Sequence, residues 1–142
     1  MEFFLRKLRA PSPEPAQVDA APAASTTKQR GDAGEQRALA HLAAAGLRLL
    51  ERNYRTPGRG GGEIDLVMRD RDGTVVFVEV RQRAGRAHGG AAASVSGVKQ
   101  RRIVFAARHY LSRLRVLPPC RFDVVTLEGE RLEWLQAAFD AA

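Results

Sequence analysis

Cysteine and histidine are too sparse in this chain to build the thiolate or imidazole metal sites that those residues commonly form. Cys120 is the only cysteine, so neither an internal disulfide nor a multi-thiolate zinc site can form. No apolar run approaches the roughly 20 residues that a membrane span requires, and the apolar stretch at the start is too short for a signal peptide. We therefore expect a cytoplasmic protein with no membrane association. The three histidines are scattered without ligand spacing: His41, His88 and His109.

Acidic residues are outnumbered by basic ones. The 142 residues include 23 Lys and Arg against 16 Asp and Glu, which gives a formal net charge of +7. This charge fits a polyanionic partner such as nucleic acid, although 20 arginines against three lysines can also reflect the nucleotide composition of the genome. Hydrophobic residues make up 44% of the chain, which excludes a disordered protein. The length suits one domain rather than two.

Proline concentrates near the start of the chain. Four of the seven prolines fall within residues 10–26, which show no apolar periodicity. We predict a disordered tail over residues 1–26 and one domain over residues 27–142. Apolar spacing in that domain predicts an α/β fold of order α-β-β-β-α-β-β. The predicted elements are a helix over 27–46, strands over 47–54, 63–68 and 74–81, a helix from Ser94 or Ser96 to about Arg115, and strands over 121–127 and 132–135.

Glycine and proline mark the expected helix ends. Gly46 should end the first helix, and Pro118 with Pro119 should stop the second. The expected inward stripe of the second helix consists of Ile103, Ala107, Tyr110, Leu111 and Leu114. Residues that we also expect to be buried are Phe105, Phe122, Trp134 and Cys120.

Two carboxylates on neighbouring strands form the first candidate site. Whether Asp65 and Glu79 share a face depends on the loop between their strands. A three-residue loop over 71–73, with Gly73 in the left-handed conformation, places Asp65 opposite Glu79. A two-residue loop would place them on opposite faces, so the parity of the loop decides whether a carboxylate pair forms.

Two facing carboxylates repel and require a cation between or beside them. A hard divalent ion is one solution, because Mg²⁺ accepts one or two carboxylates and leaves its other positions to water and phosphate. The alternative is ordinary ion pairing with Arg55, Arg81 or Arg83. The residues alone leave these two readings equally open.

Several short segments together resemble a known family. Asp65 followed at a distance by Glu79-Val80-Arg81 resembles the Asp...(Asp/Glu)-X-Lys signature of the PD-(D/E)XK nuclease superfamily, with arginine in the lysine position. More closely, five segments resemble the bacterial YraN family of predicted endonucleases, over roughly residues 27–140. The segments are 31–35 (GDAGE), 62–67 (GEIDLV), 76–81 (VFVEVR), 91–96 (AAASVS) with 99–100 (KQ), and 120–125 (CRFDVV).

This resemblance implies a restriction-endonuclease-like fold with a three-layer core and a mixed central sheet, related to archaeal Holliday junction resolvases. It also implies a Mg²⁺ site, in which Mn²⁺ can substitute, held by Glu35, Asp65 and Glu79. Independently, Glu35 lies four residues before Leu39, on the apolar stripe of its helix. An Asp32-x-x-Glu35 capping box is the alternative explanation for that glutamate.

The expected activity is metal-dependent hydrolysis of phosphodiester bonds in DNA, branched or damaged. Asp65, Glu79 and Arg81 are the candidate catalytic residues, and Glu63 could hold a metal water or a second ion. Arginine remains protonated, so Arg81 can bind phosphate but cannot act as a general base. A non-catalytic nucleic-acid-binding module is the alternative function.

Basic and hydroxyl side chains are candidates for binding nucleic acid. For the basic residues of the second helix, a solvated helix face is the competing explanation. The glycine-containing loop before that helix is equally compatible with a plain helix cap. A homodimer would suit a two-fold branched substrate, although no residue demonstrates one. The nucleic-acid-binding candidates are Arg81, Arg83, Ser94, Lys99 and Arg102.

Overall fold

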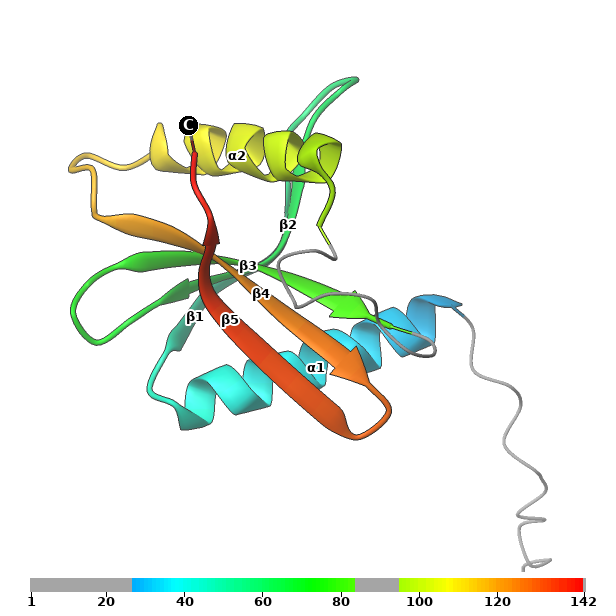
Figure 1. Cartoon of the computed structure of the whole chain (residues 1–142). Helices are drawn as coiled ribbons and strands as arrows, with labels where there is room; N and C mark the ends of the chain where they lie inside the picture. Colours follow the sequence, from blue (N-terminus) through cyan, green and yellow to red (C-terminus); the bar gives the residue numbers. More distant parts are fainter. Residues whose placement is uncertain (1–26, 84–94, 142) are drawn as a thin grey trace, which may run out of the picture.

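The computed structural model describes residues 27–83 and 95–141, and its elements follow the predicted order (Figure 1). The predicted tail over 1–26 and the candidate Ser94 lie outside the described residues. No helix in the described part of the chain is long and apolar enough to cross a membrane. The elements are α1 (Thr27–Ala44), β1 (Arg48–Arg55), β2 (Glu63–Arg69), β3 (Val75–Gln82), α2 (Gly97–Leu111), β4 (Cys120–Glu128) and β5 (Arg131–Phe139).

The five strands form one mixed sheet in the order β1-β2-β3-β4-β5. The pairs β1/β2, β2/β3 and β4/β5 are antiparallel, whereas β3 and β4 run parallel. Parallel neighbours need a crossover connection, and α2 lies within the segment that links β3 to β4. The mixed sheet expected from the sequence is therefore present.

The helices cover opposite faces of this sheet (Figure 1). Ala38 and Leu42 of α1 pack against one face, and Ile103, Ala106 and Ala107 of α2 pack against the other. The central strands are apolar toward both sides, as strands covered on two faces should be. The result is a three-layer α/β arrangement with one apolar core on each side of the sheet.

The first helix ends as the sequence predicted, whereas the second ends early. Gly46 has φ of +102°, and the chain leaves α1 there. Helix α2 begins after Ser96, whose side chain accepts a hydrogen bond from the Lys99 N–H. It ends at Leu111 rather than near Arg115, so the two prolines are not its terminator. The Ser112 hydroxyl donates to the His109 carbonyl, and the next backbone bonds tighten into a turn.

The last strand is longer than predicted because a buried carboxylate stabilises a bulge within it. Asp123 is fully buried and accepts hydrogen bonds from the Trp134 indole and from the Ala137 N–H. Ala137 has φ of +50°, and the register of β4 with β5 shifts beside it. Pairing then resumes between Phe122 and Phe139, so the predicted strand 132–135 is part of the longer β5.

Three residues expected to face the core lie on the surface. Phe105 is 55% exposed on the outer side of α2, and Cys120 is exposed at the start of β4. Leu114, predicted on the inward stripe of the second helix, is exposed because α2 has already ended at Leu111. Phe122 is buried as expected, and Trp134 packs half-buried against the α1 side. The segment around Phe105 is apolar over five consecutive residues, so its sequence does not indicate which of them face the sheet.

Candidate metal and active site

The turn between β2 and β3 brings the two predicted carboxylates together. The Asp70 N–H donates to the Thr74 carbonyl at 2.8 Å, which closes a three-residue loop, and Gly73 has φ of +90°. Continuing this register places Asp65 opposite Glu79, which confirms the predicted odd loop. The paired positions that fix the register are Leu66↔Val78, Val67↔Phe77, Met68↔Val76 and Arg69↔Val75.

The carboxylates lie where the two strands separate. Pairing of β2 with β3 ends at Leu66, although β2 continues to pair with β1 as far as Glu63. Beyond that point the Val80 N–H donates to Asp65 Oδ2 at 2.8 Å, so a side chain accepts from the backbone of β3. This fork gives the carboxylates a position between strands instead of on a continuous ladder.

Burial makes the carboxylate pair electrostatically unusual. The Glu79 side chain is only 4% exposed and is hydrogen-bonded to Asp65. Burial, followed by the charge of Asp65, raises the pKa of Glu79 to about 8. Burial also raises the pKa of Asp65, opposed by the Val80 N–H. At neutral pH the pair therefore shares a proton in the metal-free protein.

Lys99 supplies the cation beside this pair. Its Nζ lies 3.2 Å from Glu79 Oε1, and the first turn of α2 holds it there. Arg55, one of the arginines considered as a partner, instead pairs with Glu63 at 3.4 Å. The positive group beside the carboxylates is therefore a lysine of α2, which follows the Glu79-Val80-Arg81 segment in the chain.

Glu35 of α1 approaches from the opposite layer. Its side chain is 14% exposed and lies 3.8 Å from Arg52 Nη2, and the Asn53 amide nitrogen lies 3.3 Å from it in the orientation that satisfies both groups. Burial and then the negative charge of Asp65 raise the pKa of Glu35, so the two carboxylates interact electrostatically. Because α1 begins at Thr27, the capping-box explanation is wrong.

The three acidic residues are not preassembled as a closed cage. Within residues 27–83 and 95–141, no three His, Cys, Asp or Glu side chains are grouped closely enough to hold one ion. Asp65 and Glu79 nevertheless offer two carboxylates on neighbouring strands, with Glu35 near Asp65. Such a hard, oxygen-only donor set fits an ion that takes one or two carboxylates and completes its coordination with water and phosphate.

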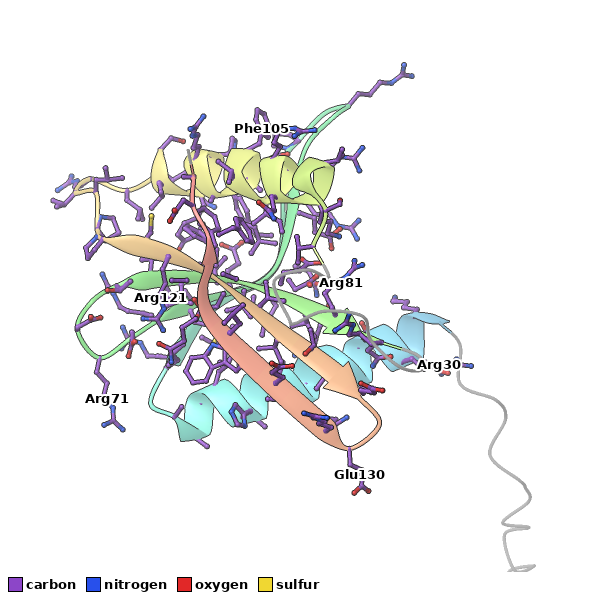
Figure 2. The ribbon with its side chains drawn as sticks, in the orientation of Figure 1. Arg30, Arg71, Arg81, Phe105, Arg121 and Glu130 are labelled. Atoms are coloured by element: carbon purple, nitrogen blue, oxygen red, sulfur yellow. The ribbon has the colours of Figure 1, made fainter. Side chains whose placement is uncertain are left out.

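The remaining candidates surround the pair at different distances. Arg81 is half-buried near the end of β3, at the opposite end of the hairpin from Arg71 (Figure 2). Glu63 is engaged with Arg55, and Arg102 is exposed on α2. Arg83 follows β3 and donates its N–H to the Leu127 carbonyl. Among the nucleic-acid-binding candidates in the described residues, Lys99 contacts the carboxylate pair directly.

Sequence reasoning missed the groups that hold this site in shape. The Gly62 N–H donates to Thr56 Oγ1 at 2.8 Å where the chain enters β2. A Cβ on Gly62 would overlap the Arg102 carbonyl oxygen, so only glycine lets β2 approach α2 this closely. Arg52 and Asn53 were also missed as partners of Glu35. Asn53 has φ of +49° within β1, a conformation that asparagine adopts more readily than most residues. The sequence does not show that its side chain faces Glu35.

The fold and the site define a three-layer α/β protein in which a buried glutamate and a half-buried aspartate meet at a strand fork, beside one lysine. The chain belongs to the uncharacterised protein family UPF0102, whose model matches residues 34–127. This confirms the YraN-like family resemblance seen in the sequence motifs.

Relatives in several bacteria match most of the chain. A UPF0102 protein of Albidiferax ferrireducens is 75% identical over 116 residues, which cover 82% of this chain and 91% of the relative. One from Acidovorax sp. strain JS42 is 66% identical and covers 88% and 95% of the two chains. One from Polaromonas sp. strain JS666 is 60% identical and covers 99% of each. All three carry the family name alone.

Proposed function

We propose that this protein is a metal-dependent endonuclease that hydrolyses phosphodiester bonds in DNA, with branched or damaged DNA as its substrate. The observation that carries the proposal is the Asp65–Glu79 pair at the fork between β2 and β3, in which Glu79 is buried, Asp65 is half-buried and Lys99 lies 3.2 Å from Glu79. Holding two carboxylates side by side in a largely buried position costs free energy. A divalent ion that binds both groups would offset that cost.

Asp65 and Glu79 would hold a hard divalent ion, Mg²⁺ or Mn²⁺, and Glu35 is placed to join them from α1. When bound, such an ion supplies Lewis acidity to the phosphodiester. Glu63 lies two residues from Asp65 on β2, and its charge contributes to the raised pKa of Asp65. It would serve as an outer partner of the ion's water molecules.

Lys99 and Arg81 have different parts in this proposal. Lys99 presents three donors next to the carboxylates and would orient a water molecule or bind a non-bridging phosphate oxygen. Arg81 remains protonated and would stabilise charge that develops on the phosphate. In the nuclease signature a lysine occupies the place of Arg81, and here α2 supplies the lysine from outside that signature.

The proposed fold relationship is to restriction-endonuclease-like proteins, including archaeal Holliday junction resolvases. It is supported by the order of elements, by acidic residues on α1 and on the following hairpin, and by the parallel β3/β4 pair reached through α2. A cytoplasmic location and a DNA partner belong to the same proposal.

Cleavage of a panel of labelled DNAs tests the activity. Single-stranded, duplex, flap and four-way-junction DNA are incubated with Mg²⁺, Mn²⁺ or EDTA. We expect metal-dependent cutting of one structure by the natural protein and at least a 100-fold loss in Asp65→Asn and Glu79→Gln, because these changes remove carboxylate charge at the ion. Glu130→Gln is the matched control, since Glu130 is exposed in the β4–β5 turn (Figure 2).

A nucleic-acid-binding module without turnover is the second candidate. The observation that favours it is Arg81, which cannot deprotonate water, together with a lysine already paired to Glu79. A module of this kind would bind DNA but would not cut it with either Mg²⁺ or Mn²⁺ present. It would also bind as well or better after Asp65→Asn, because that change removes a negative charge. Equal cutting by the natural protein and by Asp65→Asn would exclude the nuclease proposal.

A further inference from the structure

The exposed side of α2 carries an aromatic ring among arginines. Phe105 is 55% exposed and Val98, two turns earlier, is 52% exposed. Residues three and four apart on a helix are surface neighbours, so the exposed residues Arg101 and Arg102 flank Phe105 on α2. We call this surface the Phe105 face; it consists of Val98, Arg101, Arg102 and Phe105.

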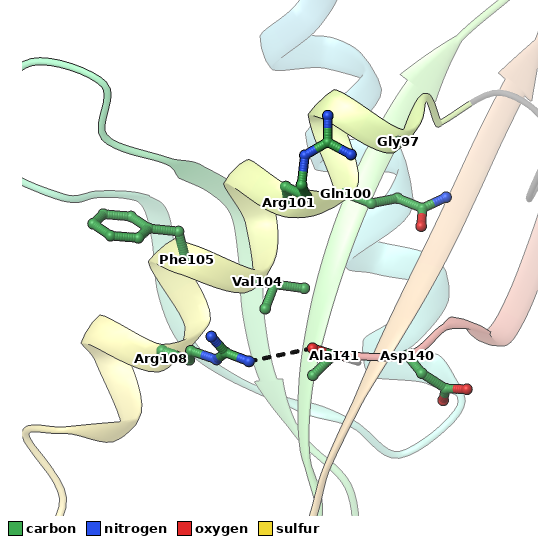
Figure 3. Close-up of a pocket in the computed structure, with 8 residues that line it drawn as sticks. All are labelled: Gly97, Gln100, Arg101, Val104, Phe105, Arg108, Asp140 and Ala141. Carbon is green, nitrogen blue, oxygen red and sulfur yellow. Dashed lines mark hydrogen bonds between the residues drawn. The ribbon is translucent and has the colours of Figure 1, made fainter.

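A hollow of about 500 Å³ borders the Phe105 face, between α2 and the residues after β5 (Figure 3). Figure 3 shows the Phe105 ring projecting from α2 away from Asp140 and Ala141, with Arg101 one turn before it. Arg108 reaches the other way and donates to the Ala141 carbonyl at 3.3 Å. Asp140 adds a carboxylate at the far side, so the positive charge lies on the helix.

We infer that the Phe105 face binds an unpaired nucleotide of the substrate, with a base stacked on the Phe105 ring and the flanking phosphates held by the surrounding arginines. The inference rests on the proposed function and names its substrate class as DNA with unpaired bases. Single-stranded nucleic acid binds to exposed aromatic rings that lie among cations. Each base can stack on a ring, and each phosphate of the backbone carries a negative charge that the cations attract.

The position of this face suits the carboxylate site. Lys99, which contacts Glu79, lies six residues before Phe105, about 9 Å along the helix axis. The two residues lie on different sides of a helix about 10 Å wide, so a strand that crosses α2 could contact both Phe105 and the fork. Helix α2 would present the lysine on its inner side and the stacking ring on its outer side.

The positive charge of the Phe105 face disfavours a second copy of the chain as its binding partner. An isologous contact would bring the Phe105 faces of two copies together and face arginine against arginine. That juxtaposition repels, whereas a polyanion neutralises the same groups and gains affinity through counterion release. Charge complementarity thus selects nucleic acid over self-association.

Binding in the absence of metal tests the inference. Fluorescence anisotropy is measured in EDTA with full-length Asp65→Asn, so that no cleavage occurs, using labelled single-stranded DNA and a duplex of equal length. We expect Phe105→Ala to weaken single-strand binding about tenfold, from the loss of one stacked base. Duplex binding should change less than twofold, and Phe105→Trp should retain single-strand affinity. Val116→Ala is the control, because Val116 is 80% exposed and lies outside α2.

Each outcome separates this inference from the function on which it rests. If no DNA binds at all, the proposed nucleic-acid function fails and the inference fails with it. If DNA binds but Phe105→Ala has no effect, or weakens single strand and duplex equally, the inference alone is overturned. A change from dimer to monomer in Phe105→Ala, with DNA binding unaltered, would identify the face as a self-association surface and also overturn it. Selective loss of single-strand binding supports it even if the natural protein cuts nothing.

Discussion

Three residues around the strand fork each stabilise one carboxylate. Val80 donates its backbone N–H to Asp65, Lys99 pairs with Glu79, and Arg52 Nη2 lies 3.8 Å from Glu35. Each of these partners comes from a different element, so no single segment of sequence contains the neutralising set. The carboxylates themselves could be predicted from the strand pattern. Lys99 was predicted only as a nucleic-acid-binding residue, and Arg52 was not predicted as part of the site.

The raised pKa of Glu79 makes the metal-free protein less stable as the pH rises. Because the folded-state pKa is about 8 and the ordinary value is 4.5, the folded protein binds more protons than the unfolded chain between those values. In EDTA the free energy of unfolding should therefore fall across that window, by up to roughly 1.4 kcal/mol per pH unit.

Urea unfolding at several pH values measures this dependence. Glu79→Gln removes the titrating group, so its unfolding free energy should be flatter with pH than that of the natural protein. Glu130→Gln should keep the natural slope. Parallel pH profiles for the natural protein and Glu79→Gln would contradict the assignment of the proton to this pair.

At the scale of elements, prediction succeeded where local chemistry decides the geometry. The odd loop with Gly73 fixed the register of β2 on β3, and Gly46 ended α1. It failed where a tertiary contact decides. The C-terminal end of α2 and the length of β5 depend on Ser112 and Asp123, and neither residue signals that role in the sequence.

The pairing of β1 with β2 contains a cross-strand repulsion. Arg48 lies directly opposite Arg69, and both are exposed beside a hollow of about 410 Å³ that Arg71 also lines. Like charges at directly opposed positions destabilise a sheet. Arg48→Gln should therefore raise the free energy of unfolding by about 0.2–1 kcal/mol, seen as a higher urea midpoint with an unchanged m-value. The same change at Arg59, exposed in the β1–β2 loop, should have no comparable effect, and a lower midpoint for Arg48→Gln would contradict this account.

For the whole molecule, composition predicted a single basic domain and the segment pattern predicted its α/β class. The three layers and the mixed sheet agree with the predicted α/β class. Which of the many arginines matter could not be predicted, because composition does not show which face each one occupies. Phe105 illustrates this limit, since a hydrophobic residue in an apolar run was assigned to the core and lies outside it.

Ion binding at the fork should stabilise the entire folded domain, since the unfolded chain lacks the site. A free ion concentration 100 times the dissociation constant adds about 2.7 kcal/mol to the free energy of unfolding. We therefore expect Mn²⁺ to raise the melting temperature relative to EDTA in the natural protein and in Glu130→Gln. Asp65→Asn should lose that increase, which differential scanning calorimetry would measure. An equal rise in all three proteins would place the ion elsewhere.

The single parallel pairing of the sheet also constrains the order in which the molecule folds. The antiparallel pairs join neighbouring segments, but Val75 of β3 meets Cys120 of β4 across 45 positions of the chain. Closing that long loop costs more conformational entropy than forming any of the three antiparallel pairs. The hairpin that bears Asp65 and Glu79 can thus form early, whereas Lys99 lies on the late-closing crossover. We therefore expect that docking of α2 completes the core and also brings the Lys99 counter-charge to the carboxylates.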